Sequence, residues 1–468
     1  MCRCCSPPGV GTGGIRQPAA AEAEPSDPAQ QMSLPPHPGL GAERTWYARN
    51  APEAQLHSVL QGHKATDVCI VGGGLAGLFL AQSLAQRSIS SILIEARQIG
   101  AGASGRNGGF CSPGWAATHA AIEKKLGVAS ARELFELSRE GFSMVRDTLQ
   151  AVDAELTWGK LQVSTFDAAD ALQRSRDHLA HRYGYDIEYL DTESVRSRLD
   201  SRRYHQGLRD PGAFHCDPLQ LCRALMSSLD PSSTELFEAT PALGFSRMPA
   251  GWQVRTPQGS IQARRLVLCC GGYGGREVGR LRRMFLPITT YIVVTPPLAA
   301  LGQVIRTTDA VSDDRRAGNY YRIVAGDRLL WGGDITAFGR HAPERIATRM
   351  GRDIAGFFPA LAGRDGSVAV EIAWSGLMGY ARHMMPQVGP LADDLWACTS
   401  FGGHGLNTAP VAARLVAEGI SGESDRWKRL APFGFCWNGG LFGPLAAESV
   451  YRLMKLADRW RALGFKSA

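Results

Sequence analysis

The 468-residue sequence lacks any apolar run of about 18 residues, the length a membrane-spanning helix requires. The N-terminus has no apolar core of the signal-peptide type. Residues 1–40 also carry too few arginines, and too many acids, for a mitochondrial presequence. We therefore expect a cytoplasmic protein without a membrane span.

The eleven cysteines include no pair of C-x-x-C motifs and no zinc-ligand spacing. This pattern argues against a disulfide framework and against a metal site. Cys69, Cys269, Cys270 and Cys398 lie in apolar, strand-like runs, where we expect reduced, buried thiols that act as small hydrophobes. The net charge of +7 comes from scattered Lys and Arg, so nothing indicates nucleic-acid binding.

What the chain does contain is a glycine-rich turn between a predicted strand, Asp67–Val71, and a predicted helix, Leu78–Ala85. The turn satisfies G-x-G-x-x-G. Gly72 permits the tight turn, Gly74 lets the backbone approach a pyrophosphate, and Gly77 lets the helix pack closely on the sheet. The helix N-terminus presents free N–H groups to phosphates. The residues predicted to contact a dinucleotide here are Gly72, Gly74, Leu75, Ala76 and Gly77.

An acid in the expected place strengthens this interpretation. A second predicted strand, Ser91–Ile94, ends on Glu95, where a carboxylate can accept from ribose hydroxyls. We include the following Ala96 and Arg97 in the contact. The alternative is an ordinary glycine-rich turn, which leaves Glu95 unexplained.

A second glycine-rich loop, Ile99–Gly109, follows directly, where a nicotinamide-binding domain would run on into another helix. Its G-A-S-G-R-N-G-G string resembles the signature of flavin-dependent amine and amino-acid oxidases. The resemblance implies that this loop wraps the pyrophosphate and the isoalloxazine edge, which favours FAD over NAD. The residues concerned are Ala103, Ser104, Gly105, Arg106, Asn107, Gly108 and Gly109. Arg106 could contact the flavin, bind a substrate carboxylate or pair with a surface acid, and we favour the cofactor.

Two later elements resemble further flavin contacts. A buried strand within Arg265–Gly272 ends in glycines, and Gly271 is the predicted contact there. A strand at Asp394–Thr399, a G-H-G loop and a helix at Leu406–Glu418 resemble the C-terminal flavin motif. The helix N-terminus can stabilise negative charge at the flavin N1/C2=O edge. The predicted contacts are Gly403, His404, Gly405, Leu406 and Asn407.

Together with Met385–Gly389, these motifs resemble the FAD-dependent D-amino-acid oxidase superfamily, and within it the gamma-glutamylputrescine oxidase-like enzymes, over roughly residues 45–460. The resemblance implies an α/β fold: a Rossmann-like FAD-binding domain, discontinuous in sequence, and a substrate domain built on a mixed or antiparallel β-sheet. The expected divisions are a disordered tail at 1–44, an FAD-binding domain at 45–155, 211–285 and 368–468, and a substrate-binding domain at 156–210 and 286–367. We expect a turn at Asp210–Pro218 to lead back to the FAD-binding domain. Met32 is a second possible start.

The family implies oxidation of the C–N bond of a small-molecule amine or amino acid. A hydride passes from carbon to flavin N5, water hydrolyses the imine, and O2 usually reoxidises the flavin with release of H2O2. Two alternatives stay open: a dehydrogenase that passes electrons to a quinone or carrier, and a non-catalytic flavin-binding redox protein. No cysteine lies near Met385, so we expect non-covalent FAD. Asn407 stands where certain relatives have lysine.

Candidate catalytic residues are His404, Tyr320 and Arg322. Strand alternation places the latter two on one face, and an arginine there would favour a substrate carboxylate. They lie in a predicted hairpin, Tyr320–Ile323 and Arg328–Asp334, with Gly326-Asp327 at the turn. Further cavity candidates, for which sheet packing or a surface position is the alternative, are Tyr321, Trp331, Tyr380, Arg382 and His383.

Overall fold

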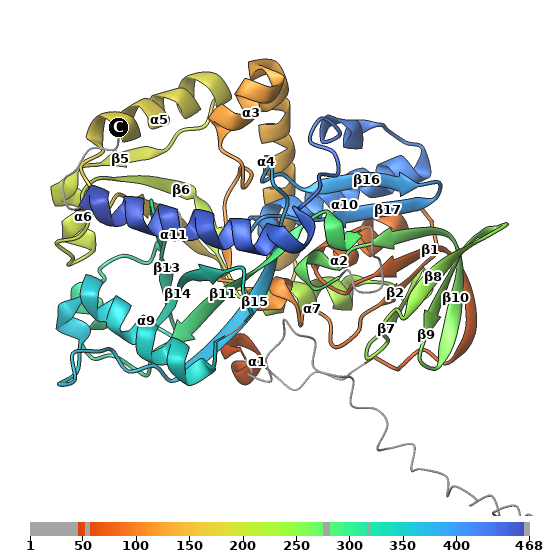
Figure 1. Cartoon of the computed structure of the whole chain (residues 1–468), viewed down its shortest axis with the longest axis horizontal. Coiled ribbons are helices and arrows are strands. Elements are labelled where there is room, and N and C mark those ends of the chain that lie inside the picture. The colour runs from red at the N-terminus through yellow and green to blue at the C-terminus, as the bar shows by residue number, and fades with distance from the viewer. Residues whose placement is uncertain (1–44, 52–56, 275–280, 316–317, 340, 463–468) are drawn as a thin grey trace, which may run out of the picture. The chain divides into compact units, whose positions relative to one another are not determined.

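The computed structural model describes residues 45–51, 57–274, 281–315, 318–339 and 341–462 (Figure 1). The predicted tail at residues 1–44, including Met32, lies outside the described residues. The helices described are α1 Trp46–Asn50, α2 Leu75–Ala85, α3 His119–Leu126, α4 Val128–Gln150, α5 Ala169–Tyr183, α6 Thr192–Arg198, α7 Pro218–Ser228, α8 Leu301–Val304, α9 Pro343–Phe357, α10 Gly405–Ser421 and α11 Gly443–Ala462. None of these helices is both long and apolar enough to cross a membrane.

The first sheet has a parallel centre and the strand order β16-β17-β10-β1-β2-β7, with β9 beside β10 and β8 beside β9. Its strands are β1 Gly62–Val71, β2 Ser91–Ile94, β7 Thr234–Phe237, β8 Gly244–Met248, β9 Gly251–Thr256, β10 Gly259–Leu268, β16 Gln387–Ala392 and β17 Leu395–Thr399. β1 begins at Gly62 rather than Asp67, because its polar first half pairs with β10, from Gly62 opposite Gly259 onward. Apolar periodicity reports only the buried half of that strand.

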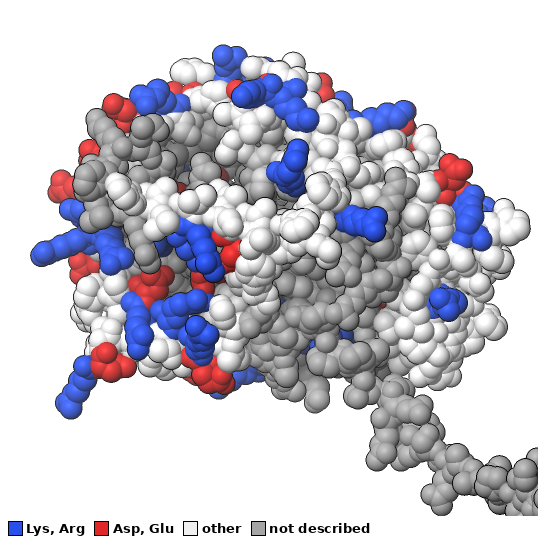
Figure 2. All heavy atoms as spheres, viewed as in Figure 1, with Lys and Arg blue, Asp and Glu red and all other residues white. Residues whose placement is uncertain are grey.

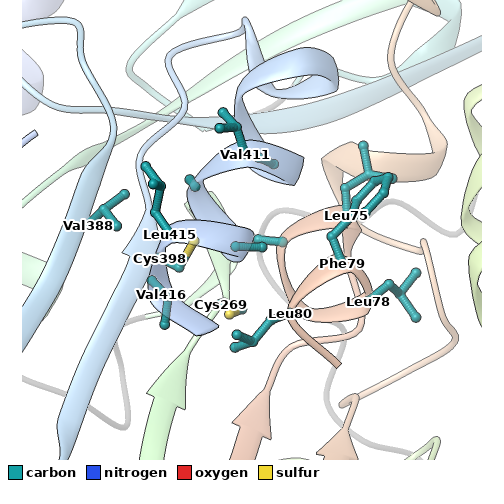
Figure 3. Close-up of a cluster of buried hydrophobic side chains, with 14 of the residues drawn as sticks. Leu75, Leu78, Phe79, Leu80, Cys269, Val388, Cys398, Val411, Leu415 and Val416 are labelled. Carbon is teal, nitrogen blue, oxygen red and sulfur yellow. The ribbon is translucent and has the colours of Figure 1, made fainter. Parts of the chain in front are cut away.

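Two apolar helices pack on this sheet (Figure 3). Leu78 and Phe79 of α2 and Val411 and Leu415 of α10 are fully buried in one cluster, with Cys269 and Cys398 at the carboxyl ends of strands β10 and β17. Burying each large apolar side chain contributes about 1.5–3 kcal/mol. This packing holds the N-termini of α2 and α10 at the carboxyl edge of the parallel strands, where nucleotides bind in such sheets.

The second sheet is mixed and has the strand order β15-β11-β14-β13-β12-β4-β6-β3, with β5 beside β6. Its strands are β3 Phe110–Cys111, β4 Thr157–Val163, β5 Glu188–Leu190, β6 Gly207–His215, β11 Leu286–Val294, β12 Ala310–Asp313, β13 Tyr320–Val324, β14 Arg328–Thr336 and β15 Ile372–Tyr380. β12 and β4 run parallel and the other described pairs run antiparallel. The expected fold class, a Rossmann-like sheet with a second mixed sheet, is confirmed.

The hairpin predicted in this sheet is present as β13 and β14. Ala325 and Gly326 have positive φ (52° and 77°), so the turn uses left-handed backbone. Behind it, Tyr321 stacks on Trp331 with ring centroids 4.6 Å apart, in the core under α9. Those two candidates are therefore packing residues and not cavity residues.

The turn expected at Asp210–Pro218 begins later than predicted, although the chain does pass there into the core of the first sheet through α7. β6 continues to His215 in the second sheet, and the helix α7 starts at Pro218 after the N-cap Asp217. The Pro-Gly pair sits in a bulge: the register of β6 against β4 shifts there, and the Asp210 carboxylate accepts from the amides of Gly212 and Ala213 at 3.0 and 3.1 Å. An Asx turn inside a strand gives the same local sequence signal as a chain reversal.

The two sheets meet beyond the end of β10. At Gly272 an added Cβ would lie 3.1 Å from the Gly379 nitrogen of β15. The Tyr273 hydroxyl accepts from the Leu377 amide at 2.9 Å. The carboxyl edge of the first sheet therefore opens against β15 and its neighbours in the second.

Candidate functional site

The first glycine loop has no room for side chains at two of its three motif positions. Gly72 has φ +114°, and a Cβ there would lie 2.8 Å from the Cys269 carbonyl oxygen. At Gly77 a Cβ would lie only 2.0 Å from the Gly72 oxygen, which shows how closely α2 approaches the turn. Contacts within the chain therefore explain why positions 72 and 77 require glycine.

The N-terminus of α2 has donors to spare. The first intrahelical bond runs from the Leu78 amide to Gly74 O at 3.0 Å, and the Leu75 amide donates to Ser104 Oγ at 2.9 Å. Gly74, the N-cap, supplies no side chain, and the first turn has no acid. The buried amides of Ala76 and Gly77 have no described acceptor, so this end fits an anionic group such as a pyrophosphate.

Glu95 ends β2 as predicted, and its carboxylate organises the turn. It accepts from the amides of Gly73 at 2.7 Å and Arg97 at 3.0 Å. Burial raises its pKa, those two amides oppose the rise, and the charge of Glu238 adds to it. Ala96 is exposed, and the Arg97 carbonyl accepts from Ala239.

Sequence reasoning missed Glu238, which follows β7 just as Glu95 follows β2. Its carboxylate accepts from the amides of Ile99 at 2.6 Å and His57 at 2.8 Å. An acid after a second parallel strand was the available signal. The two carboxylates together fix the chain on both sides of the turn.

The second glycine loop, which contains the short 3-10 turn Ala103–Gly105, is stapled by Asn107. The Asn107 Nδ2 donates to the carbonyls of Ala103 and Ser104 at 3.0 and 2.9 Å, and its Oδ1 accepts from the Gly109 amide at 2.8 Å. The backbone around Gly105 is held by a bond from its amide to the Gly100 oxygen. The hydrogen bonds of the Asn107 side chain therefore hold the backbone of this loop in one conformation.

Arg106 ties the same loop to β15. Its Nε donates to Ala101 O at 2.9 Å and its Nη1 to Ser375 O at 2.8 Å, while its own carbonyl accepts from Trp374 Nε1 at 2.8 Å. The arginine therefore joins the second glycine loop to β15 through backbone carbonyls.

Arg322 of β13 is buried and bonded on all sides. Its guanidinium donates to Gly108 O at 2.9 Å, Cys216 O at 3.0 Å and Tyr47 Oη at 3.3 Å. Tyr47, which sequence reasoning missed, donates in turn to the Asn107 carbonyl at 2.8 Å. In this structure Arg322 anchors the second glycine loop to the second sheet.

His215 completes the surroundings of Arg322. Burial, and then the charge of Arg322, lower the pKa of His215 to about 4, so the ring is neutral. Its Nε2 donates to Thr308 O at 2.9 Å, and its Nδ1 accepts from Arg322 at 3.3 Å. This assignment uses both ring nitrogens.

Tyr320, two residues before Arg322, also lies against the loop. Its ring packs edge-on against Phe110 with centroids 5.7 Å apart, and a Cβ at Gly108 would lie 2.9 Å from it. Both residues therefore contact the same segment, as their shared strand face implies. The Tyr320 ring stays only half-buried although it lies deep in the molecule, and burial raises the pKa of its hydroxyl to about 12.

The C-terminal glycine loop brings His404 to the start of α10. Gly403 has φ +77°, and a Cβ on it would meet Tyr380 Oη at 2.8 Å, so the loop lies directly on β15. His404 is the N-cap residue, and its Nε2 is buried without a hydrogen-bond partner among the described residues. Burial, reinforced by the charge of Lys160, lowers its pKa to about 4. The ring is neutral and offers an unused nitrogen.

The remaining predicted contacts of this motif support the loop. The Asn407 Nδ2 donates to Gly114 O at 3.0 Å, and Leu406 is buried in the core with it. Gly405 is the first residue of α10. Gly271, the contact predicted after β10, has φ +56° and no atom within 4 Å of a Cβ position, so it faces open space.

Lys160 of β4 was missed by sequence reasoning. Its Nζ donates to Ser112 Oγ at 2.9 Å, and within the described residues it forms no ion pair. Burial lowers its pKa, and the charge of Asp210 opposes this. The sequence signal that could have identified it is a single lysine in a predicted strand, between Gly159 and the buried Leu161.

Of the remaining candidates, Tyr380 lies at the site and the other two do not. The pKa of Tyr380 is raised by burial, with the nearby hydroxyls of Tyr451 and Tyr320 adding to the shift. Arg382 is exposed, whereas His383 bonds to Gly434 O at 3.2 Å and accepts from the Met385 amide at 3.1 Å. Those two residues belong to surface and loop structure.

Loops and strands from both sheets thus bring these side chains close together. Tyr320, Tyr380, His404 and Lys160 are each only partly covered by protein atoms although they lie in the interior. No group of three or more acids, histidines and cysteines that could hold a metal occurs in the described part of the chain. Glycine cradles, free amides and an unpaired imidazole fit a dinucleotide cofactor with a small polar substrate.

Comparison with known proteins agrees with this geometry. Residues 67–419 match the family model described as FAD-dependent oxidoreductase (DAO). The chain is 30% identical over 393 residues to the probable oxidoreductase OrdL of Rhizobium meliloti, covering 82% of this chain and 91% of that protein. It is 28% identical over 393 residues to the gamma-glutamylputrescine oxidoreductase of Escherichia coli, covering 83% and 91%. Glycine oxidase from Geobacillus kaustophilus shares the fold, with a TM-score of 0.66, 20% identity and coverage of 80% and 99%.

Proposed function

The chain belongs to the DAO family of FAD-dependent oxidoreductases, and from that premise we propose that it oxidises the C–N bond of an amine or amino acid, in the manner of a gamma-glutamylputrescine oxidoreductase. When bound, FAD would supply the acceptor for the hydride that leaves the substrate carbon, and O2 would take up the electron pair with two protons and leave as H2O2. Water hydrolyses the resulting imine to a carbonyl compound and an amine or ammonia.

The observation that carries this proposal is the desolvation of the polar groups of the inner site. An amine can give up a hydride only when its nitrogen holds a lone pair, so the substrate ammonium must first lose a proton. Burial lowers the pKa values of both His404 and Lys160. The same desolvation lowers the pKa of any ammonium bound beside them.

We assign the residues distinct roles on this basis. The amides of Ala76 and Gly77 at the start of α2 receive the pyrophosphate, and Glu95 contacts the ribose. His404, with its unpaired Nε2, is the candidate hydrogen-bond partner for the reacting end of the substrate or the flavin edge.

Two more side chains complete the assignment. Tyr320, packed on the second glycine loop, lines the substrate space. Arg322 is a positioning residue, since its guanidinium bonds to the loop and not to the cavity.

We propose that the FAD is held without a covalent bond. Cys111, Cys216 and Cys222 lie against the second glycine loop, and all three are buried. Burial raises the pKa of Cys216 to about 12 and that of Cys111 well above its usual range, so both remain thiols and poor nucleophiles. Acid precipitation should release all flavin into the supernatant, and yellow pelleted protein would contradict this.

The test of the reaction is anaerobic mixing of the FAD-loaded protein with gamma-glutamylated polyamines, D- and L-amino acids, N-methyl amino acids and simple amines. Bleaching of the visible flavin band by one class supports the proposal and identifies the substrate class. Readmitted air should restore the band and yield H2O2. Slow recovery without peroxide would indicate a dehydrogenase, and no bleaching by any compound would refute amine oxidation.

A further inference from the structure

The C-terminal helix α11 is attached to the rest of the chain through its polar side. Glu448 accepts from Thr336 Oγ1 at 3.0 Å and from the Ala337 amide at 3.1 Å, both at the end of β14. Two turns further on, Lys455 pairs with Asp334 at 2.8 Å. Glu448 and Lys455, charged residues of a kind that usually faces water, thus form the contact between α11 and the end of β14.

The outer side of α11 and the segment just before it expose many apolar side chains. Eight of the thirteen large hydrophobic side chains exposed in the described residues lie between positions 437 and 460: Trp437, Leu441, Phe442, Leu445, Val450, Leu453, Leu456 and Trp460. Leu453 is 66% exposed and Leu445 57% exposed. In Figure 2 uncharged surface over α11 is interrupted by Lys and Arg and by a few acids. A contiguous apolar stripe of this kind marks a binding surface.

We propose that this stripe docks the protein on an anionic lipid membrane, with α11 lying in the plane of the interface. Residues 437–468 contain five Lys or Arg and two acids, a net charge of +3, and the whole chain carries +7. Leucines with a tryptophan, Trp437 or Trp460, towards each end of the stripe and basic residues along the helix are typical of interfacial helices that rest on anionic lipid without spanning it.

The same charges disfavour other occupants. A second copy of the chain would bring two +3 segments together. The chain's own residues 1–44 are rich in Pro, Gly and Ala and offer few large apolar side chains to cover the stripe. Positive charge is complementary to an anionic bilayer.

The stripe is separate from the cofactor machinery. α11 lies outside the part of the chain that matches the flavin-enzyme family, residues 67–419. The inner face of α11 nevertheless lies near Tyr380. The hydroxyl of Tyr451 is close enough to that residue to help raise its pKa. Docking would place the substrate space on the membrane-proximal side.

The test is flotation of the full-length, FAD-loaded protein with phosphatidylcholine vesicles, with or without phosphatidylglycerol. We expect binding to the anionic vesicles alone, weakened by added salt. The double variant Leu453→Glu/Leu456→Glu should reduce binding at least 10-fold, while turnover of a soluble substrate stays unchanged. Leu243→Glu, at a position 53% exposed elsewhere on the surface, is the matched control and should bind like the unaltered protein.

Arg452→Gln keeps the apolar stripe and removes one outer charge, so it serves as the second variant should the double variant fold poorly. About 1 kcal/mol per basic residue at an anionic surface corresponds to roughly 5-fold weaker binding. Equal binding to neutral and anionic vesicles would overturn the role of charge. No binding to either, with a concentration-dependent dimer abolished by the double variant, would identify a second copy as the occupant and overturn the proposal.

Discussion

The second glycine loop and the region around His404 differ in how their polar side chains are hydrogen-bonded. Around the loop, Asn107, Arg106 and Arg322 are bonded to backbone carbonyls, so each side chain acts as a brace. At the start of α10, His404 Nε2 is buried without a hydrogen-bond partner among the described residues. Lys160, close to it, has no ion pair among those residues. Unsatisfied buried groups cost stability and are kept where a ligand completes them.

The first and largest test of this contrast is Gly77→Ala on the cofactor side. The new Cβ would lie 2.0 Å from the Gly72 oxygen, so α2 must move away from the turn. We expect loss of bound FAD and about 3 kcal/mol of destabilisation. Flavin content after gel filtration and urea unfolding measure the two effects. Gly302→Ala, where a Cβ meets no atom within 4 Å, is the control.

Arg322→Met removes the hydrogen bonds that anchor the second glycine loop. We expect it to lower the free energy of unfolding more than it changes the rate of flavin reduction. The carbonyls of Gly108 and Cys216 would lose buried charged donors, at a cost of about 3 kcal/mol in the free energy of unfolding. FAD affinity should fall with it. The exposed Arg382→Met should change stability by less than about 0.5 kcal/mol. A stable Arg322→Met protein with intact FAD that fails only in turnover would instead assign Arg322 to the substrate.

His404→Gln should give the opposite pattern. No described hydrogen bond of Nε2 is lost, so we expect normal FAD content and a stability change below about 1 kcal/mol. If Nε2 contacts the reacting groups, the anaerobic rate of flavin reduction should fall about 100-fold. An unchanged reduction rate would show that the imidazole only shapes the loop before α10.

The smallest effect concerns pH. Burial lowers the pKa values of His404 and His215 to about 4 in the folded protein, below the ordinary value of 6.5. The unfolded chain therefore binds more protons between pH 6.5 and 4, and folding stability falls as the pH drops through that window. Each histidine should cost about 1 kcal/mol at a pH of about 5.5. Unfolding of His404→Gln should show a shallower pH slope, and a parallel slope would contradict the assignment.

Sequence periodicity predicted the elements whose signal is local. β2 occurs at Ser91–Ile94 as predicted, and the glycine spacing identified the turn before α2. Each depends on residues adjacent in the chain. The turn expected at Asp210–Pro218 begins later than predicted because a bulged strand and a reversal use the same Pro, Gly and Asp residues.

The amino-acid sequence by itself determined the cofactor class, since glycines at fixed spacing and an acid after the next strand are read without knowing the fold. Only the tertiary structure decided which polar side chains remain available. It bonds Arg322 to a loop more than 200 residues away and leaves His404 unpaired beside Lys160. Whether a buried group finds a partner depends on segments brought together by packing, and no local pattern records that.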